Sequence, residues 1–394
     1  MQIDLFCRVV DNYGDVGVCW RLARQLVAEH GCAVRLIVDD LRAFRVIAPE
    51  LDAAAAQQSL LGVEVVAWRE DIDLTPGDVA IEAFACDPPA SYVDAMALRS
   101  AKPVWINLEY LSAETWVDQV HGMPSQHQRL PLTKYFFCPG FTEASGGLIR
   151  ESLVVRPTRL PLGSLSPGER VGVRDGAIGP SWAGTRRPSP LTPRPSPGQA
   201  LPPRGEGDKP ATFRVLAFAY PDAPVHTLTQ AFATAGVSTT ITLAAPLART
   251  DEIWQTAAPV AQTEFDALLA DYDFLIVRGE DSFVRAQLAA IPFLWHIYPT
   301  HDGAHLIKLD AWMDRYCDGL EGNAAAAYRV ASHAFNSTQT IAAQSAPYEH
   351  LAHHLATLAG HAERWRDALM QQTDLATRLI AFIETLIEPK SQIK

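Results

Sequence analysis

The chain has 394 residues, of which 48% are hydrophobic, and a formal net charge of −12 at pH 7. Single hydrophobic cores stop growing at about 250–300 residues, so the length predicts two domains. The acidic balance argues against a nucleic-acid partner, because nucleic-acid affinity comes from Lys and Arg that neutralise phosphates. The six cysteines are scattered and include no Cys-x-x-Cys pair. They indicate reduced, packed thiols rather than a disulfide framework or a zinc site.

The first segment, MQIDLFC, reads as a strand and lacks the basic region and apolar core of a signal peptide. No apolar run approaches the roughly 20 residues that a membrane-spanning helix needs. We therefore expect a cytoplasmic protein that has no membrane partner.

The first half alternates strand-like and helix-like segments. Near-continuous apolar strands separated by helices indicate a parallel sheet covered on both faces, in a Rossmann-like layout. The predicted strands are 3–10, 33–38, 63–68, 79–84 and 104–108, and the predicted helices include 16–30 and 92–99.

The segment 172–208 is rich in proline and includes RRPSPLTPRPSP. Proline at this density supports neither a helix nor a central strand, so the segment is predicted to be a disordered linker. Its Pro-x-x-Pro spacing also fits an SH3-type ligand, but the linker is the better interpretation. We place a domain boundary here, with residues 1–165 before it and the insertion at 166–210.

The strand and helix pattern restarts after the linker, and long helical stretches end the chain. The last stretch, 350–386, is expected to break around Gly360. We predict a second α/β domain at 211–375 and a final helix at 376–394 that packs back on the first domain. Two Rossmann-like domains facing a central cleft, with C-terminal helices, are the GT-B arrangement of nucleotide-sugar glycosyltransferases. The predicted elements are strands at 213–218, 238–243, 274–277 and 293–297 and helices at 227–235, 265–270, from 282, 305–316 and 324–333.

An acidic loop, Asp11-Asn12-Tyr13-Gly14-Asp15, follows the first predicted strand. Ligands of open α/β sheets bind at the carboxyl ends of the strands, which favours a functional site here. The alternative is structural, with Asp15 as the N-cap of the next helix and Asp11 as a turn former.

A second acidic loop, Arg278-Gly279-Glu280-Asp281-Ser282, follows a strand of the second half. The amides of Asp281 and Ser282 and the Ser282 hydroxyl are placed to hold a diphosphate at a helix N-terminus, with Arg278 and Arg285 nearby. Glu280 is then suited to a sugar or ribose hydroxyl. The structural alternative is a Ser or Asp cap flanked by surface arginines.

Two other patterns suggest metal chemistry, and we interpret both as structural. Asp271-Tyr272-Asp273 fits the Asp-x-Asp pattern of metal-dependent sugar transferases, but it precedes its strand and is better explained as a turn. His296, His301 and His305 lack cysteine partners or a settled ligand spacing. We therefore expect no metal.

Five runs of the sequence carry a resemblance to a known family: VVDNYGDVGVCWRLA (9–23), IEAFAC (81–86), WINLEYL (105–111), FCPGFT (137–142) and RGEDSF (278–283). In these runs and in their order the chain closely resembles the EarP family, bacterial protein-arginine rhamnosyltransferases that modify elongation factor P. The resemblance covers nearly the whole chain except the proline-rich segment.

The resemblance implies an inverting GT-B enzyme without a metal cofactor. Its donor is dTDP-β-L-rhamnose, and its acceptor is one arginine of elongation factor P, which relieves ribosome stalling at proline runs. The N-terminal domain is implied to receive the acceptor and the C-terminal domain to hold the donor. Asp11, Asp15 and Glu280 match the essential acids, with Asp15 as general base. The residues that match donor-binding positions are Tyr13, Gly14, Tyr220, Gln262, Phe265, Arg278, Gly279, Asp281, Ser282 and Tyr298.

The acids have a chemical reason in such a reaction. A guanidinium has a pKa above roughly 12 and is a poor nucleophile until a group orients it and withdraws charge or a proton. Paired carboxylates can clamp it and face the attacking nitrogen. The sequence leaves three other interpretations open: a GT-B enzyme with another acceptor, a nucleotide-sugar epimerase, and a nonenzymatic nucleotide-binding partner.

Overall fold

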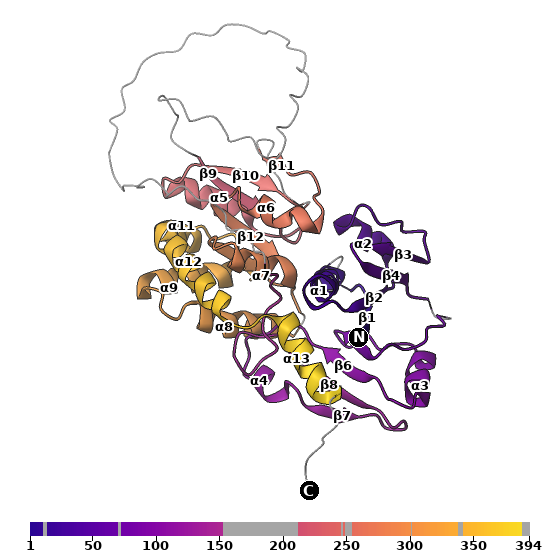
Figure 1. Cartoon of the computed structure of the whole chain (residues 1–394). Coiled ribbons are helices and arrows are strands. Elements are labelled where there is room, and N and C mark those ends of the chain that lie inside the picture. The colour runs from indigo at the N-terminus through magenta and orange to yellow at the C-terminus, as the bar shows by residue number, and fades with distance from the viewer. Residues whose placement is uncertain are drawn as a thin grey trace, which may run out of the picture. The chain divides into compact units, whose positions relative to one another are not determined.

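The computed structural model describes residues 1–10, 14–69, 72–152, 212–245, 247–248, 254–300, 302–337 and 342–387. Both α/β halves belong to one compact unit (Figure 1). The proline-rich segment predicted to be a linker lies outside the described residues, as do Asp11 and Tyr13 of the first acidic loop. Among the helices that are described, none has the length and apolar character required to span a bilayer.

The N-terminal half is built on an eight-stranded sheet with the order β3-β4-β2-β1-β5-β6-β8-β7. Its six central strands are parallel, and only the edge strands β3 and β7 run antiparallel to their neighbours. The parallel part follows the Rossmann order, which reverses between β1 and β5. The bounds are β1 Gln2–Cys7, β2 Ala33–Val38, β3 Gln57–Leu60, β4 Val63–Ala67, β5 Val79–Ala83, β6 Val104–Leu108, β7 Pro124–Gln126 and β8 Thr133–Phe137.

The central strands form because their side chains are apolar on both faces. In β1, Leu5 packs into one hydrophobic core and the next residue, Phe6, into a second core on the opposite face. Alternate side chains of a strand point to opposite faces, so a strand without a polar face must be covered twice. The helices of this half are α1 Gly14–His30, α2 Leu41–Ile47, α3 Ala90–Leu98 and α4 Trp116–Val120.

The C-terminal half repeats the plan with a five-stranded parallel sheet in the order β11-β10-β9-β12-β13. Its order reverses between β9 and β12. The strands are β9 Phe213–Ala217, β10 Thr239–Leu243, β11 Gln255–Thr256, β12 Phe274–Arg278 and β13 Phe293–His296. The helices between these strands are α5 Val225–Thr234, η1 Gln262–Glu264, α6 Phe265–Leu269 and α7 Glu280–Leu288. The predicted alternation of strand and helix is therefore confirmed in both halves.

Five further helices lie in the described part of the chain after β13: α8 Ala304–Tyr316, α9 Gly322–Phe335, α11 Ala346–Ala352, α12 Leu355–Gln371 and α13 Leu375–Ile387. The predicted break at Gly360 is wrong, because α12 continues through that residue. The breaks fall instead after Ala352 and after Gln371. Gly360 is tolerated inside the helix because a single glycine costs only about 1 kcal/mol there.

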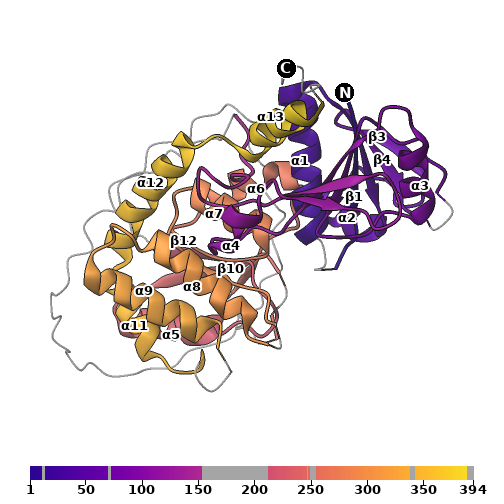
Figure 2. The ribbon, with the colours of Figure 1, turned by 90° about the horizontal axis from the view of Figure 1, so that it is seen from below.

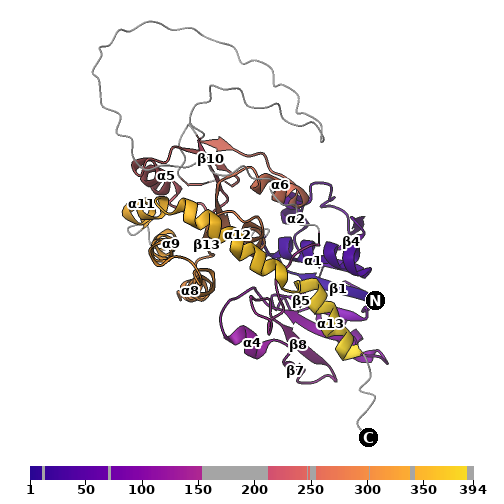
Figure 3. The ribbon, with the colours of Figure 1, turned by 60° about the vertical axis from the view of Figure 1, so that its left-hand side comes forward.

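The last helix, α13, contacts α1 and β6 of the N-terminal half (Figure 2 and Figure 3). The Leu375 amide donates to the Leu148 carbonyl at 2.8 Å, and Arg378 donates to the carbonyls of Thr142, Glu143 and Ser145. Phe382 lies near the rings of the β8 strand. The helix α13 therefore packs against the N-terminal half.

The sequence analysis did not find β3, β7, β8 and β11 or the short helices α2 and α4. β3 shows why: its four residues alternate between exposed and half-buried, and it pairs only at the sheet edge. An edge strand with little apolar burial carries a weak hydrophobic pattern. Such strands are recognised from their pairing partners rather than from their own residues.

Candidate active site

A pocket with a volume of about 120 Å³ lies where the strands of the C-terminal sheet end. Residues of both acidic loops line it, Gly14 from the first and 278–282 from the second. Gly17 and α2 residues also contribute, so both halves of the protein form its wall. The carboxyl ends of β9 and β12 mark the reversal of strand order, where ligands bind in open α/β sheets.

One wall of the pocket is apolar and aromatic. Phe218, directly after β9, and Phe265, at the start of α6, pack edge to face with ring centroids 5.8 Å apart. Pro259 and Val260 extend this wall. The Arg278 guanidinium lies 4.9 Å from the Phe218 ring centroid. The wall therefore combines flat apolar surface with a cation at its edge, as a nucleotide base and its phosphates require.

The N-terminus of α7 points its first turn at the pocket. Gly279 precedes the helix with φ +65° and ψ −176°, a conformation that essentially only glycine adopts without strain. The first amides of a helix have no intrahelical acceptor and attract anions. The Ser282 hydroxyl donates to the Arg278 carbonyl oxygen, and no side chain caps the helix. The alternative of a Ser or Asp cap is therefore wrong.

Asp15 lies in the first turn of α1 rather than before it, so the N-cap alternative is wrong for this loop too. Its carboxylate accepts a hydrogen bond from the Val10 amide at 2.8 Å and one from the Tyr110 hydroxyl at 3.2 Å. The Tyr110 ring is stacked on Phe84, with centroids 4.2 Å apart. Burial, followed by the charges of Asp15 and Glu280, raises the pKa of the Tyr110 hydroxyl, which therefore stays a donor.

Glu280 connects the second loop to the same part of the N-terminal half. It accepts from the Leu111 amide at 3.0 Å and from the Lys308 ammonium at 2.9 Å. Leu111 follows Tyr110 in the chain, so adjacent residues after β6 contact Asp15 and Glu280. The two acids thus lie on either side of one short segment.

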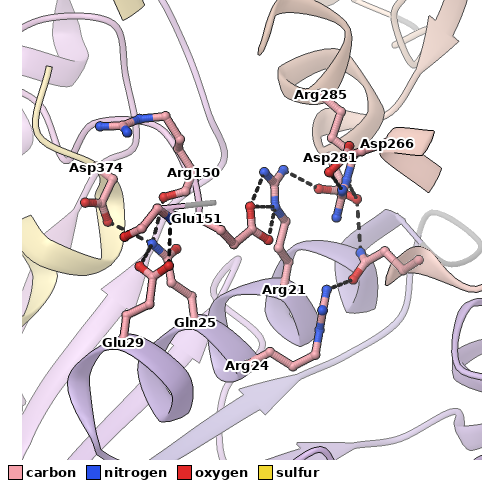
Figure 4. Close-up of polar contacts among 12 residues, drawn as sticks. Arg21, Arg24, Gln25, Glu29, Arg150, Glu151, Asp266, Asp281, Arg285 and Asp374 are labelled. Atoms are coloured by element: carbon pink, nitrogen blue, oxygen red, sulfur yellow. Dashed lines mark hydrogen bonds and ion pairs between the residues drawn. The ribbon is translucent and has the colours of Figure 1, made fainter. Parts of the chain in front are cut away.

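Asp281 has turned toward α1, where a network of charged side chains joins the halves (Figure 4). Arg21 of α1 donates to the Asp281 carboxylate at 2.9 Å and forms a bidentate pair with Glu151. The second Asp281 oxygen accepts from Arg285 at 2.9 Å and from Gln262 at 3.0 Å. Arg285 is only 3% exposed and is not the surface arginine of the structural alternative.

Within the network, Arg21 compensates the charges of Glu151 and Asp281. Burial alone would raise the pKa of Glu151, but the charge and hydrogen bonds of Arg21 outweigh it and lower that pKa to about 2. Burial likewise opposes ionisation of Asp281, but Arg285 and Arg21 hold its pKa below the usual range. The pKa of Arg21 is raised because Glu151 and Asp281 overcome the burial of its guanidinium. All three groups are therefore ionised at neutral pH.

The pocket gathers most, but not all, of the predicted site residues. Tyr220 and Tyr298 pack edge to face at 5.6 Å beside it and do not line it. Asp15 lies beyond its edge, at Tyr110. Asp11 and Tyr13 are outside the described residues, so their predicted roles stay predictions. The predicted residues that line the pocket are Gly14, Gln262, Phe265, Arg278, Gly279, Glu280, Asp281 and Ser282.

Sequence reasoning assigned no role to Phe218, Tyr110, Lys308 or Arg21. Phe218 had a signal, because it is an aromatic residue at the carboxyl end of a predicted strand. Tyr110 and Arg21 lie within the runs that carried the resemblance. Lys308 had no local signal, since only the fold brings α8 to Glu280.

The described residues of the two patterns that suggested metal chemistry occupy structural positions. Asp271 and Asp273 lie between the end of α6 and the start of β12, as a helix-to-strand turn, which confirms that interpretation. His296 is buried and its Nδ1 accepts from the Tyr220 amide at 3.2 Å. Within the described ranges, no three His, Cys, Asp or Glu side chains are grouped to hold a metal ion.

Two Rossmann-type halves with a pocket lined by strand-end loops of both are the GT-B arrangement that nucleotide-sugar glycosyltransferases have. Residues 3–169 and 200–384 match the family model described as elongation-factor P (EF-P) rhamnosyltransferase EarP. The chain therefore belongs to this family.

Relatives agree over nearly the full length. A protein-arginine rhamnosyltransferase of Pseudomonas putida is 43% identical, with 96% of this chain and 97% of the relative aligned. One from Pseudomonas aeruginosa is 40% identical over 96% and 98% of the two chains. A solved structure described as the structural basis for EarP-mediated arginine glycosylation of translation elongation factor EF-P is similar with a TM-score of 0.55. It is 27% identical, and the match covers 98% of this chain and 99% of that one.

Proposed function

We propose that this protein transfers rhamnose from dTDP-β-L-rhamnose to an arginine side chain of elongation factor P, with inversion at the anomeric carbon. The modified factor would act on ribosomes stalled at proline runs. Membership of the family supports the acceptor and the sugar. The observation that carries the site is that Gly14 of the first acidic loop and residues 278–282 of the second line the same pocket.

The donor fits the C-terminal wall of the pocket. Phe218 and Phe265 offer an apolar surface for the thymine ring, since bases bind by stacking on aromatic side chains. The amides at the start of α7 and the Arg278 guanidinium are placed for the diphosphate. These amides and the Arg278 guanidinium stabilise the negative charge that develops on the leaving dTDP, so that dTDP can depart without a metal.

The acceptor arginine is assigned to the Asp15 side. A guanidinium attacks only when one nitrogen is oriented and its charge is drawn away, and a carboxylate does both. Asp15 is held by Val10 and Tyr110, so its orientation is set before the acceptor arrives. Asp11, placed by the resemblance on the same loop, would clamp the guanidinium.

In the proposed reaction, a guanidinium nitrogen forms a bond to the anomeric carbon while the bond from that carbon to the dTDP oxygen breaks. Asp15 takes the proton that the nitrogen loses. The nucleophile and the leaving group are on opposite faces of the sugar, so the β-linked donor gives an α-linked product. No sugar-enzyme intermediate is needed.

The test is intact-mass analysis of elongation factor P after incubation with this protein and dTDP-rhamnose. We expect a mass increase of one deoxyhexose, located on one arginine by peptide mapping, and an α-linkage by NMR. Reactions without donor and with the mapped arginine replaced by lysine are the controls. Donor that is converted or hydrolysed while the factor stays unmodified would favour an epimerase or another acceptor. Chelator in the reaction should leave the rate unchanged.

A further inference from the structure

The face of α1 opposite its sheet carries a set of residues that contact the C-terminal half. Gly17, Arg21 and Arg24 are spaced four and three residues apart and therefore share one helix face. The Gly17 backbone carbonyl accepts from the Gln262 side-chain amide at 2.7 Å, and Arg24 donates to the Gln262 side-chain oxygen Oε1 at 2.9 Å. A Cβ on Gly17 would lie 3.3 Å from the Gln262 amide nitrogen, so glycine permits this close approach.

Arg21 is the centre of this contact. Its side chain is 1% exposed, and its fork is divided between Glu151, in a bidentate pair, and Asp281, at 2.9 Å. Burying a guanidinium is costly unless carboxylates compensate its charge, so Glu151 and Asp281 fix the place of the Arg21 guanidinium. The bidentate pair also fixes the plane of the guanidinium and hence the direction of the Asp281 contact.

Asp281 belongs to the first turn of α7, next to the residues that line the pocket. Its neighbour Glu280 is attached to the N-terminal half by a second contact, with the Leu111 amide. Arg21 is six residues after Asp15 on α1. The same helix therefore carries Asp15 in its first turn and, about two turns later, the arginine that binds Asp281. The spacing between Asp15 and the α7 first turn therefore depends on the Arg21–Asp281 pair.

We propose that Arg21 is a positioning residue that sets the α7 first turn, and with it the donor diphosphate, at the distance from Asp15 that transfer requires. This inference rests on the proposed function for its chemistry. Arg21 acts through Asp281 and does not itself line the pocket. A shift of about 1 Å between reacting groups costs roughly a hundredfold in rate, so a small displacement of α7 is enough to abolish most turnover.

The experiment compares Arg21→Met, Arg21→Lys and Arg35→Met. Arg35 is the matched control, because it forms a bidentate pair with buried Asp4, at 2.7 Å for both contacts, within the N-terminal half alone. For Arg21→Met we expect kcat to fall about a hundredfold while the Kd for dTDP changes by less than about threefold. Arg21→Lys, which keeps the charge but not the fork, should recover part of kcat. Arg35→Met should lose stability but keep kcat.

Hydrogen exchange of the ligand-free proteins gives a readout that needs no substrate. Peptides covering α7 should exchange about tenfold faster in Arg21→Met and at the wild-type rate in Arg35→Met. Equal exchange of α7 in Arg21→Met and wild type would overturn the proposal. So would wild-type kcat in that variant, or equal losses of kcat and dTDP affinity. A wild-type protein that transfers no sugar would refute the proposed function instead, and the exchange comparison would still decide the role of Arg21.

Discussion

The two acidic loops both follow the carboxyl ends of central strands, β1 in one half and β12 in the other, but their carboxylates have different partners. Asp15 accepts hydrogen bonds from two neutral donors of its own half. Asp281 is bound by two guanidinium groups, and one of them, that of Arg21, belongs to the other half. An acid at a strand end therefore cannot be assigned a role from its type and place alone. Its partners show that Asp281 joins the two halves, whereas the Val10 and Tyr110 donors to Asp15, the proposed base, belong to one half.

The sharpest test of this difference is Asp15→Asn. The amide keeps the size and most hydrogen bonds of the carboxylate but cannot take a proton, so we expect kcat to fall by about a thousandfold or more. The Kd for dTDP and the melting temperature should stay near wild type. Turnover is measured by the mass change of elongation factor P. Near-wild-type turnover would remove Asp15 as the base.

Asp281→Asn should lower kcat, as Arg21→Met does, and should also lower stability. Removing one charge from a buried pair leaves uncompensated guanidinium groups, and we expect a loss of about 3 kcal/mol in the free energy of unfolding. Urea unfolding gives this value. Glu143→Gln is the matched control, because Glu143 pairs with Arg378 but is 79% exposed, and it should cost less than about 1 kcal/mol. Similar losses in both variants would contradict the comparison.

The same network predicts a pH dependence of stability. The folded pKa of Glu151 is lowered from 4.5 to about 2, so its contribution is present above pH 4.5 and is lost as pH falls toward 2. The full loss is about 3 kcal/mol, at roughly 1.4 kcal/mol for each pKa unit. In Glu151→Gln the free energy of unfolding should fall less steeply over this pH window. Parallel curves for the variant and wild type would show that Glu151 is not stabilised by its partner.

Phe265→Ala should weaken the binding of the donor nucleotide and leave the charged network around Arg21 unchanged. Losing one aromatic wall of the pocket is expected to raise the Kd for dTDP about tenfold, since base stacking contributes about 1–3 kcal/mol. Isothermal titration calorimetry measures it. Phe382→Ala, on α13 and away from the pocket, is the control. An unchanged Kd in Phe265→Ala would place the base elsewhere.

Tyr110→Phe should have the smallest effect of the series. It removes the hydroxyl that donates to Asp15 and keeps the ring stacked on Phe84. The loss of one hydrogen bond to a charged group is worth about 1.5 kcal/mol, so kcat should fall roughly tenfold. Turnover is measured by the mass change of elongation factor P, and wild-type kcat in this variant would show that the Tyr110 hydroxyl does not position Asp15.

Much of the fold was predictable from local pattern. The apolar strands 33–38 and 104–108 match the observed β2 and β6 residue for residue, because strands buried on both faces are continuous apolar runs. The edge strand β3 and the break points after Ala352 and Gln371 were not predictable in this way. Their positions depend on which surfaces of the neighbouring strands and helices are still uncovered, and a local sequence pattern does not contain this information.

The candidate site likewise has a part that the local sequence predicts and a part that it does not. Gly14, Gly279 and Ser282 were predictable, because strand-to-helix turns that approach a ligand need small residues at fixed places. The partners of the acids were not. Arg21 and Asp281 are 260 residues apart and Lys308 and Glu280 are 28 apart, and side chains that distant meet only through the fold.

The sequence by itself determined two Rossmann-type halves, two acidic loops at strand ends and the family to which the chain belongs. These follow from hydrophobic periodicity, from the backbone freedom of glycine and from the order of residues in the runs. Only the tertiary structure decided which partners each acid has, because the charges and donors within a few ångströms of a carboxylate come from distant parts of the chain. At Asp281 those are Arg21, Arg285 and Gln262, and they make it a link between the halves.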